Sequence, residues 1–148
     1  MKDTTHYNRI IFILSLIGFC IALYVTQSFL RKKGILCVNT GCELVRKSPA
    51  SYLFGVVPVP SVGLMGYAVL AIAAFARTMN QKKHVDTLLL RIMLGMSAFG
   101  VVFVSWFTYT ELFVIRGICT WCAISAVLMV CIFVLTSQMV KTHHPHTS

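Results

Sequence analysis

Four long runs of apolar residues constrain the fold of this chain more than any other feature. They cover residues 10–30, 60–77, 88–109 and 119–140, and each is close to the roughly 20 residues that a helix needs to cross a bilayer core. Because 57% of the 148 residues are hydrophobic and only 11% are charged, little sequence is left for a soluble domain. We therefore expect an all-α integral membrane protein, a four-transmembrane-helix bundle that forms a single domain over residues 1–148.

The first run is predicted to be a retained span and not a cleaved signal peptide. It is longer than the usual signal-peptide core of about 7–15 residues, and the basic residues 31–33 follow it where small residues would mark a cleavage site. The net charge of +9 does not predict nucleic-acid binding, because the basic residues flank every span and are suited to anchoring helix ends in lipid headgroups. They are divided almost evenly between the two sides, so charge does not set the orientation.

Four of the six cysteines form two closely spaced pairs. Cys119 and Cys122 make a C-x-x-C motif at the start of the fourth run, where the unpaired N–H groups of a helix N-terminus favour a thiolate. Cys37 and Cys42 lie in the polar segment of residues 31–59, for which we predict a redox loop. With four spans, this loop and the connection 110–118 lie on the same side of the membrane. The sequence thus predicts a thiol–disulfide centre built from both pairs.

Local sequence features of the loop and of the second span lead to two further predictions. Residues 43–54 could form a short surface helix with Leu44, Tyr52, Leu53 and Phe54 turned inward, although Pro49 would kink or restart it. Gly63 and Gly66 are predicted to give the second span a small-residue face for close helix packing.

The remaining cysteines and histidines are not predicted to carry chemistry. Cys20 and Cys131 fall in the middle of spans and are expected to be inert packing residues. The cluster His143, His144 and His146 is read as a polar tail on the opposite face from the cysteine pairs. No metal site is expected, because the spacing of Cys37 and Cys42 is wide for zinc.

Two other classes of function stay open. The two thiol pairs could instead carry soft metal ions such as Hg(II) or Cu(I) across the membrane. Alternatively, the chain could be a non-catalytic four-span structural protein in which both pairs are static bridges. Since four cysteines allow three connectivities, the sequence does not choose the resting pairing.

The order of motifs in the loop and the second span resembles the vitamin K epoxide reductase family. Bacterial members have a loop cysteine, a Gly-Cys-Glu, a serine, a Phe-Gly, a proline and a Gly-x-x-Gly-Tyr at the second span, followed by a C-x-x-C opening the fourth span. The matching positions here are Cys37, Gly41-Cys42-Glu43, Ser48, Phe54-Gly55, Pro58, Gly63-Leu64-Met65-Gly66-Tyr67 and Cys119–Cys122. The resemblance covers roughly residues 10–140.

This resemblance implies an enzyme, a membrane thiol–quinone oxidoreductase that supports disulfide bond formation. Electrons would pass from a separate thioredoxin-like partner to Cys37 and Cys42, then to Cys119, and then from Cys122 to a non-covalent quinone of the ubiquinone, menaquinone or vitamin K type. Ser48 matches a family serine that helps order the quinone region. Trp121 and Phe113 are candidates for stacking on the quinone ring.

The chain departs from the vertebrate enzymes at two places. These have a tyrosine one turn beyond the C-x-x-C and an asparagine before the second span, whereas Ala126 and Val59 stand here. Many bacterial relatives also carry a fused thioredoxin-like domain after the last span, and this chain stops at Ser148, so the partner is expected to be a separate protein. We expect a multi-pass protein of the bacterial inner membrane with its cysteines on the periplasmic side, because disulfides persist in oxidising compartments.

Overall fold

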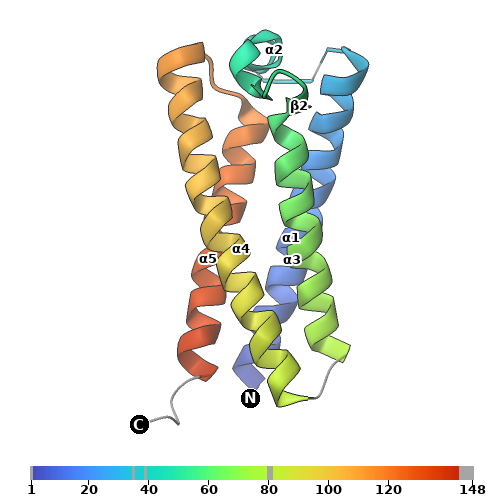
Figure 1. Ribbon diagram of the computed structural model, residues 1–148, viewed down its shortest axis with the longest axis vertical. Coiled ribbons are helices and arrows are strands. Elements are labelled where there is room, and N and C mark those ends of the chain that lie inside the picture. The colour runs from blue at the N-terminus through green and yellow to red at the C-terminus, as the bar shows by residue number, and fades with distance from the viewer. Residues whose placement is uncertain (1, 35, 39, 80–81, 144–148) are drawn as a thin grey trace.

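The computed structural model (Figure 1) describes residues 2–34, 36–38, 40–79 and 82–143. Four long helices run along the molecule and form a bundle: α1 (Lys2–Arg31), α3 (Val59–Met79), α4 (Lys83–Thr110) and α5 (Thr120–His143). All four are long and apolar enough to cross a membrane. The predicted all-α fold with four spans is confirmed, and the chain is an integral multi-pass membrane protein.

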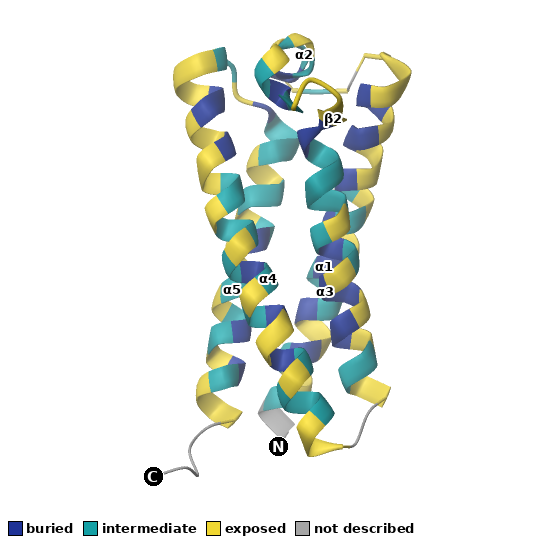
Figure 2. Ribbon diagram, in the orientation of Figure 1, coloured by how far each residue is buried: buried dark blue, intermediate teal, exposed yellow. Residues whose placement is uncertain are grey.

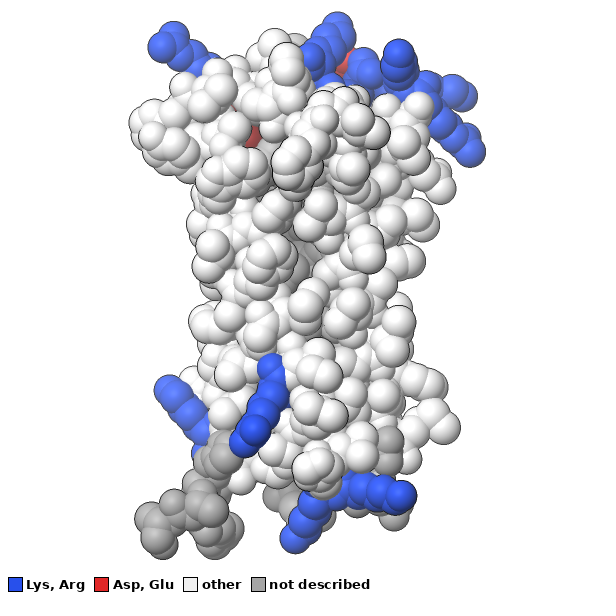
Figure 3. Space-filling view, in the orientation of Figure 1, with Lys and Arg blue, Asp and Glu red and all other residues white. Residues whose placement is uncertain are grey.

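The surface of the bundle is that of a membrane-embedded protein. Large apolar side chains such as Ile13, Phe75 and Phe99 lie exposed on the outside of the helices, while the buried residues face inward (Figure 2). On the face shown in Figure 3, lysine and arginine side chains gather at the two ends of the molecule and leave a band without basic side chains between them. Cys20 and Cys131 lie exposed on this apolar surface. They do not pack inside the bundle, which differs from the expectation that they are packing residues.

Tyr67 of α3 holds the middle of the bundle together. Its side chain is fully buried, and its ring lies so close to Gly18 of α1 that a Cβ at Gly18 would come within 2.3 Å of it. The Tyr67 hydroxyl donates a hydrogen bond of 2.8 Å to the carbonyl oxygen of Ser125 in α5. One tyrosine therefore links three helices, and only glycine at position 18 permits this packing.

The loop after α1 folds over one end of the bundle. It contains α2 (Gly41–Lys47), a 3₁₀ turn (Pro49–Ser51) and the short antiparallel strands β1 (Tyr52–Leu53) and β2 (Val57–Pro58).

The surface helix predicted for residues 43–54 is therefore wrong in extent. The chain turns extended at Ser48, because a residue before proline avoids the helical region, and Pro49 starts a new turn. Leu44 and Phe54 are exposed, not turned inward, whereas Tyr52 and Leu53 are partly buried and pack against the core as predicted. Phe54 lies at the hairpin tip with a positive φ of 54°.

The opposite end of the bundle, near the N-terminus, is closed by a polar network. Arg77 of α3 makes two hydrogen bonds to Asp86 of α4, of 2.7 and 3.1 Å, and His143 of α5 contacts the same carboxylate at 3.1 Å. Arg77 also donates a hydrogen bond to the Oδ1 of Asn8 in α1 at 3.5 Å, and Asn8 donates to the carbonyl oxygen of Ala74 at 2.9 Å. The network connects all four long helices.

We expect Asp86→Ala to lower the free energy of unfolding by about 2 kcal/mol, because it leaves the buried guanidinium of Arg77 without its charged partner. Unfolding in mixed micelles by increasing SDS would measure the change. His84→Ala is the matched control, since His84 lies exposed in the first turn of the same helix. Equal stability of the two variants would show that the network does not hold this end together.

Candidate redox site

The structure brings the two cysteine pairs together at the end of the bundle that carries α2. Cys37 and Cys42 form a disulfide with a Cα–Cα distance of 6.3 Å, whereas Cys119 and Cys122 are free thiols. The Sγ atoms of Cys42 and Cys119 lie 3.3 Å apart, although 77 positions separate them in the sequence. A sulfur at this distance is in contact with the disulfide, so exchange between the pairs requires no large movement of the backbone.

Two glycines permit this close approach. Gly41 lies directly before Cys42, and a Cβ there would sit 2.1 Å from the carbonyl oxygen of Ile118, the residue before Cys119. Gly117 packs in turn against Leu44 of α2, where a Cβ would come within 3.2 Å of that side chain. The backbones of α2 and of the segment before α5 thus touch because neither glycine has a side chain.

Cys119 and Cys122 occupy different positions at the start of α5. The helix begins at Thr120, one residue later than predicted, so Cys119 precedes it and Cys122 lies in its first turn. Cys119 is 1% exposed and packs with Cys42, Val45 and Phe107. A hydrogen bond from the Cys122 thiol lowers the pKa of Cys119 to about 7, so a large fraction of Cys119 is thiolate near neutral pH.

Hydrogen bonds hold the loop cysteine Cys37 near this centre. The indole N–H of Trp121 donates to the carbonyl oxygen of Leu36 at 2.8 Å, and the N–H of Leu36 donates to the Tyr24 hydroxyl at 3.3 Å. The rings of Trp121 and Tyr24 also pack edge to face, with centroids 5.6 Å apart. Trp121, inside the C-x-x-C, therefore fixes the residue that precedes Cys37.

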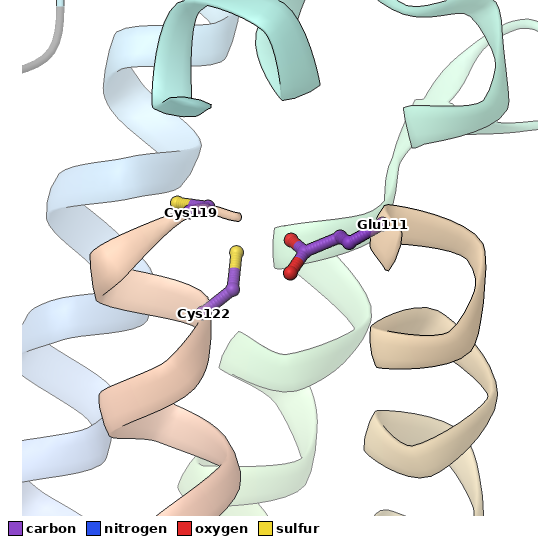
Figure 4. Close-up of side chains that lie close together, drawn as sticks. All are labelled: Glu111, Cys119 and Cys122. Atoms are coloured by element: carbon purple, nitrogen blue, oxygen red, sulfur yellow. The ribbon is translucent and has the colours of Figure 1, made fainter. Parts of the chain in front are cut away.

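A buried carboxylate faces the two free thiols. Glu111 follows α4 at the start of a single π-helical turn (Glu111–Ile115) and is 2% exposed. Its carboxylate points toward Cys122 (Figure 4), and one ligand atom from each of Glu111, Cys119 and Cys122 lies within 4.8 Å of the other two. The Oε1 atom of Glu111 has no hydrogen-bond partner within the part of the chain that the structure describes.

Glu111 is a site residue that the sequence pattern did not predict, because residues 110–118 have the composition of a connecting loop. One feature of the sequence does mark Glu111 as a candidate site residue. Leu112–Ile115 continue the apolar pattern of the third span, so Glu111 is a charge within an apolar stretch, and such charges are rarely tolerated without a function.

An apolar cavity of about 250 Å³ opens beside Cys122, between the four long helices. Its walls include Val59, Gly63, Phe103, Phe107, Trp121 and Cys122. A Cβ at Gly63 or Gly66 would meet nothing within 4 Å, so the prediction that these glycines pack against another helix is wrong. They leave open space, and both line the cavity.

Two residues predicted to contact a quinone lie elsewhere. Phe113 is 66% exposed and packs on Tyr109 with ring centroids 4.7 Å apart, because the π-helical turn directs it outward. Ser48 caps the 3₁₀ turn by accepting a hydrogen bond from the N–H of Ala50 at 3.3 Å. Neither lines the cavity, whereas Trp121 and Cys122 do.

The thiols and the carboxylate also form a possible metal-ligand set. Two sulfurs and one oxygen within 4.8 Å suit a soft divalent ion, although a structural zinc site needs a fourth ligand. The disulfide at Cys42 removes the nearest additional thiolate from that set.

Comparison with known protein families decides the identity of the bundle. The sequence profile described as the vitamin K epoxide reductase family matches residues 9–137, which include both cysteine pairs, α3 and α4, and most of α1 and α5. The chain belongs to the vitamin K epoxide reductase family. This is a family of oxidoreductases, so the chain is assigned to the membrane oxidoreductases. No curated protein matches the chain.

Proposed function

We propose that this member of the vitamin K epoxide reductase family is a quinone-dependent thiol–disulfide oxidoreductase. It takes electrons from a separate thioredoxin-fold protein and supports disulfide formation in an oxidising compartment. The single observation that carries the proposal is the 3.3 Å contact between Cys42 of a disulfide and the free thiol of Cys119. A static structural bridge has no need of a second, ionisable thiol against one of its sulfurs.

The exchange chemistry follows from the positions of the four sulfurs. A thiolate of the external protein attacks Cys37, which is less buried than Cys42, and Cys42 leaves as a thiolate. The second thiol of that protein then releases Cys37 by forming the external protein's own disulfide, so both loop cysteines are reduced. The Cys42 thiolate then attacks Cys119 of an oxidised Cys119–Cys122 pair. Cys37 resolves the resulting Cys42–Cys119 bond by attacking Cys42, which restores the loop disulfide and leaves both helix cysteines reduced. This is the redox state that the structure has.

The cavity beside Cys122 fits a lipid-soluble acceptor. Its lining is almost wholly apolar and Cys122 lies in its wall, while the Tyr67 hydroxyl and Ser125 add a small number of polar groups. A bound quinone would supply a two-electron, two-proton acceptor for the Cys119–Cys122 dithiol. The glycines at positions 63 and 66 keep the space open, and Trp121 borders it.

The orientation is part of the proposal. Since disulfides persist where thiol-reducing systems are absent, we place the cysteine end of the bundle on the periplasmic side of a bacterial inner membrane. A membrane-impermeant maleimide applied to intact cells should label the loop cysteines at Cys37, the more exposed of the two, after mild reduction. Labelling only after the membrane is permeabilised would place them on the cytoplasmic side and contradict this orientation.

Purified protein supplied with a reduced thioredoxin-fold protein and a short-chain ubiquinone or menaquinone analogue should form quinol at a steady rate, followed by quinone absorbance. Cys119→Ala should stop quinol formation, because the Cys42 thiolate then has no disulfide to attack. The control is the double variant Cys20→Ala and Cys131→Ala, which removes the two cysteines that lie outside the centre. Quinol formation that continues in Cys119→Ala would refute the electron path.

The soft-metal alternative is favoured by one observation, the ligand set formed by Glu111, Cys119 and Cys122. It predicts that the reduced protein binds Hg(II) or Cu(I) tightly and does not reduce quinone. Metal stoichiometry of the reduced protein, measured beside the quinol assay, separates the two functions.

A further inference from the structure

Glu111 is a buried acid that the exchange chemistry described above does not use. It is 2% exposed, and its Oε1 has no hydrogen-bond partner among the described residues. A carboxyl group in such a place is costly, since burial without full hydrogen bonding penalises the charged form and leaves a polar atom unsatisfied. Its neighbours are the two sulfurs that gain and lose protons during turnover (Figure 4).

The proton balance of the exchange identifies what this carboxyl group can do. When the Cys42 thiolate attacks Cys119, a Cys42–Cys119 bond forms, the Cys119–Cys122 bond breaks, and the electron pair of the broken bond stays on Cys122. Cys122 would leave as a thiolate in an apolar, largely buried setting. A proton supplied at that moment makes Cys122 a better leaving group, and only a nearby acid can supply it without bringing water into the cavity.

We propose that Glu111 is the proton donor and acceptor for Cys122. In the forward step, protonated Glu111 gives its proton to the Cys122 sulfur, so Cys42 is oxidised, Cys122 is reduced to a thiol, and Glu111 is left as a carboxylate. When the dithiol is oxidised again, the Glu111 carboxylate takes the proton back from Cys122. Atoms and charge balance in each direction. The proposed centre consists of the sulfurs of Cys119 and Cys122 and the carboxyl group of Glu111.

The surrounding groups indicate that Glu111 exchanges its proton with Cys122 and not with Cys119. The titratable groups that face Glu111 are the thiols of Cys119 and Cys122, both from the start of α5. Cys119 also faces Cys42 of α2, which is held in the disulfide. The Cys122 sulfur, in the first turn of α5, faces the Glu111 carboxylate (Figure 4), so Cys122 is the thiol placed to exchange a proton with it. Glu111 lies across the space from Cys122 and can exchange that proton.

The π-helical turn places the carboxyl group. Glu111–Ile115 form a single π turn, which closes with the N–H of Gly117 donating to the carbonyl oxygen of Glu111 at 3.1 Å and with Arg116 in the left-handed region at φ 55°. Single π turns are rare and occur frequently at functional sites. Here the turn directs Phe113 outward and keeps Glu111 inside, beside the first turn of α5.

This inference rests on the proposed exchange between the pairs, and it can be tested without quinone. Protein with both pairs oxidised is given one equivalent of dithiothreitol, and quenched alkylation with mass spectrometry follows the thiols as they move from Cys37 and Cys42 to Cys119 and Cys122. We expect Glu111→Gln to slow this transfer about 10²-fold at neutral pH and to change its pH profile, because glutamine has the same shape but cannot ionise. Glu111→Asp should retain much of the rate.

The matched control is Glu43→Gln, a carboxylate at the same end of the molecule that pairs with Arg46 at 2.7 Å and is partly exposed. It should transfer thiols at the wild-type rate with the wild-type pH profile. If wild-type protein moves no thiols between the pairs, the proposed function fails. If wild type does so and Glu111→Gln matches it in rate and pH profile, only the role of Glu111 fails.

A second measurement keeps the test decisive if Glu111→Gln folds poorly. Oxidising the Cys119–Cys122 dithiol of wild-type protein with diamide should produce an infrared difference signal of a carboxylate becoming a protonated carboxyl group. Glu43→Gln should show the same signal and Glu111→Asp a shifted one. A difference spectrum without a carboxyl signal would overturn the proposal.

Discussion

Replacing Gly41 with alanine should slow electron transfer between the two cysteine pairs at least about 10²-fold. The added Cβ would lie 2.1 Å from the carbonyl oxygen of Ile118, far inside van der Waals contact, and the atom it meets is backbone that cannot rotate away. The segments that carry Cys42 and Cys119 must therefore separate by about an ångström. Displacing reacting atoms by about 1 Å costs about 10² in rate, because the attacking sulfur no longer contacts its target.

The transfer is measured with dithiothreitol and quenched alkylation in protein without quinone. Gly95→Ala is the matched control, since a Cβ at Gly95 in α4 meets nothing within 4 Å and the substitution favours the helix. The Cys37–Cys42 disulfide should still form in Gly41→Ala, because that bond lies within the loop. Wild-type transfer in this variant would mean that the loop adjusts freely and that the contact between α2 and the Cys119 segment does not set the sulfur distance.

The sequence predicted those parts of the structure that depend on apolar content and on topology. Residues 10–30 and 119–140 could be assigned to spans because a bilayer requires about 20 apolar residues and tolerates few charges. Given four spans, the placement of Cys37 and Cys119 at one end followed from counting crossings. Neither step needs knowledge of side-chain packing.

The parts that the sequence did not predict depend on contacts between distant residues. Gly41 looks like any loop glycine until the backbone of Ile118 is placed against it. Gly63 and Gly66 have the spacing of a helix-packing motif, yet they border a cavity, because the same small residues serve close packing and open space. Glu111 interrupts the apolar pattern just after residue 109, so the sequence predicts the end of the helix there, whereas the structure continues through the π turn.

In the proposed function, exchange with a soluble thiol protein and reaction with a quinone take place at different positions along the bundle axis. Cys37 lies partly exposed in the loop, and Cys122 lies in the wall of an apolar cavity. Cys119 lies between the two, buried and in contact with Cys42. This arrangement keeps a soluble thiol protein away from the cavity and makes each transfer depend on a sulfur contact inside the molecule.

Removing the Cys122 thiol should abolish quinone reduction and also change the acidity of Cys119. In Cys122→Ala no Cys119–Cys122 disulfide can form, so quinol formation should fall below detection. The hydrogen bond that lowers the pKa of Cys119 to about 7 is also lost, and the pKa should rise toward the ordinary thiol value of 9.0. A raised pKa means less thiolate at neutral pH, so the rate of Cys119 alkylation should keep climbing with pH where wild type has levelled off.

Two opposing effects determine how much Cys122→Ala slows the attack of Cys119 on the loop disulfide. At pH 7 a rise in pKa from about 7 to about 9 lowers the thiolate fraction about fiftyfold, whereas the more basic thiolate is about tenfold more nucleophilic. Attack of Cys119 on Cys42, seen as release of the Cys37 thiol, should therefore slow about fivefold at pH 7 and recover near pH 9. Cys131→Ala, deeper in the same helix, is the control. An unchanged alkylation profile in Cys122→Ala would show that Cys122 does not set the ionisation of Cys119.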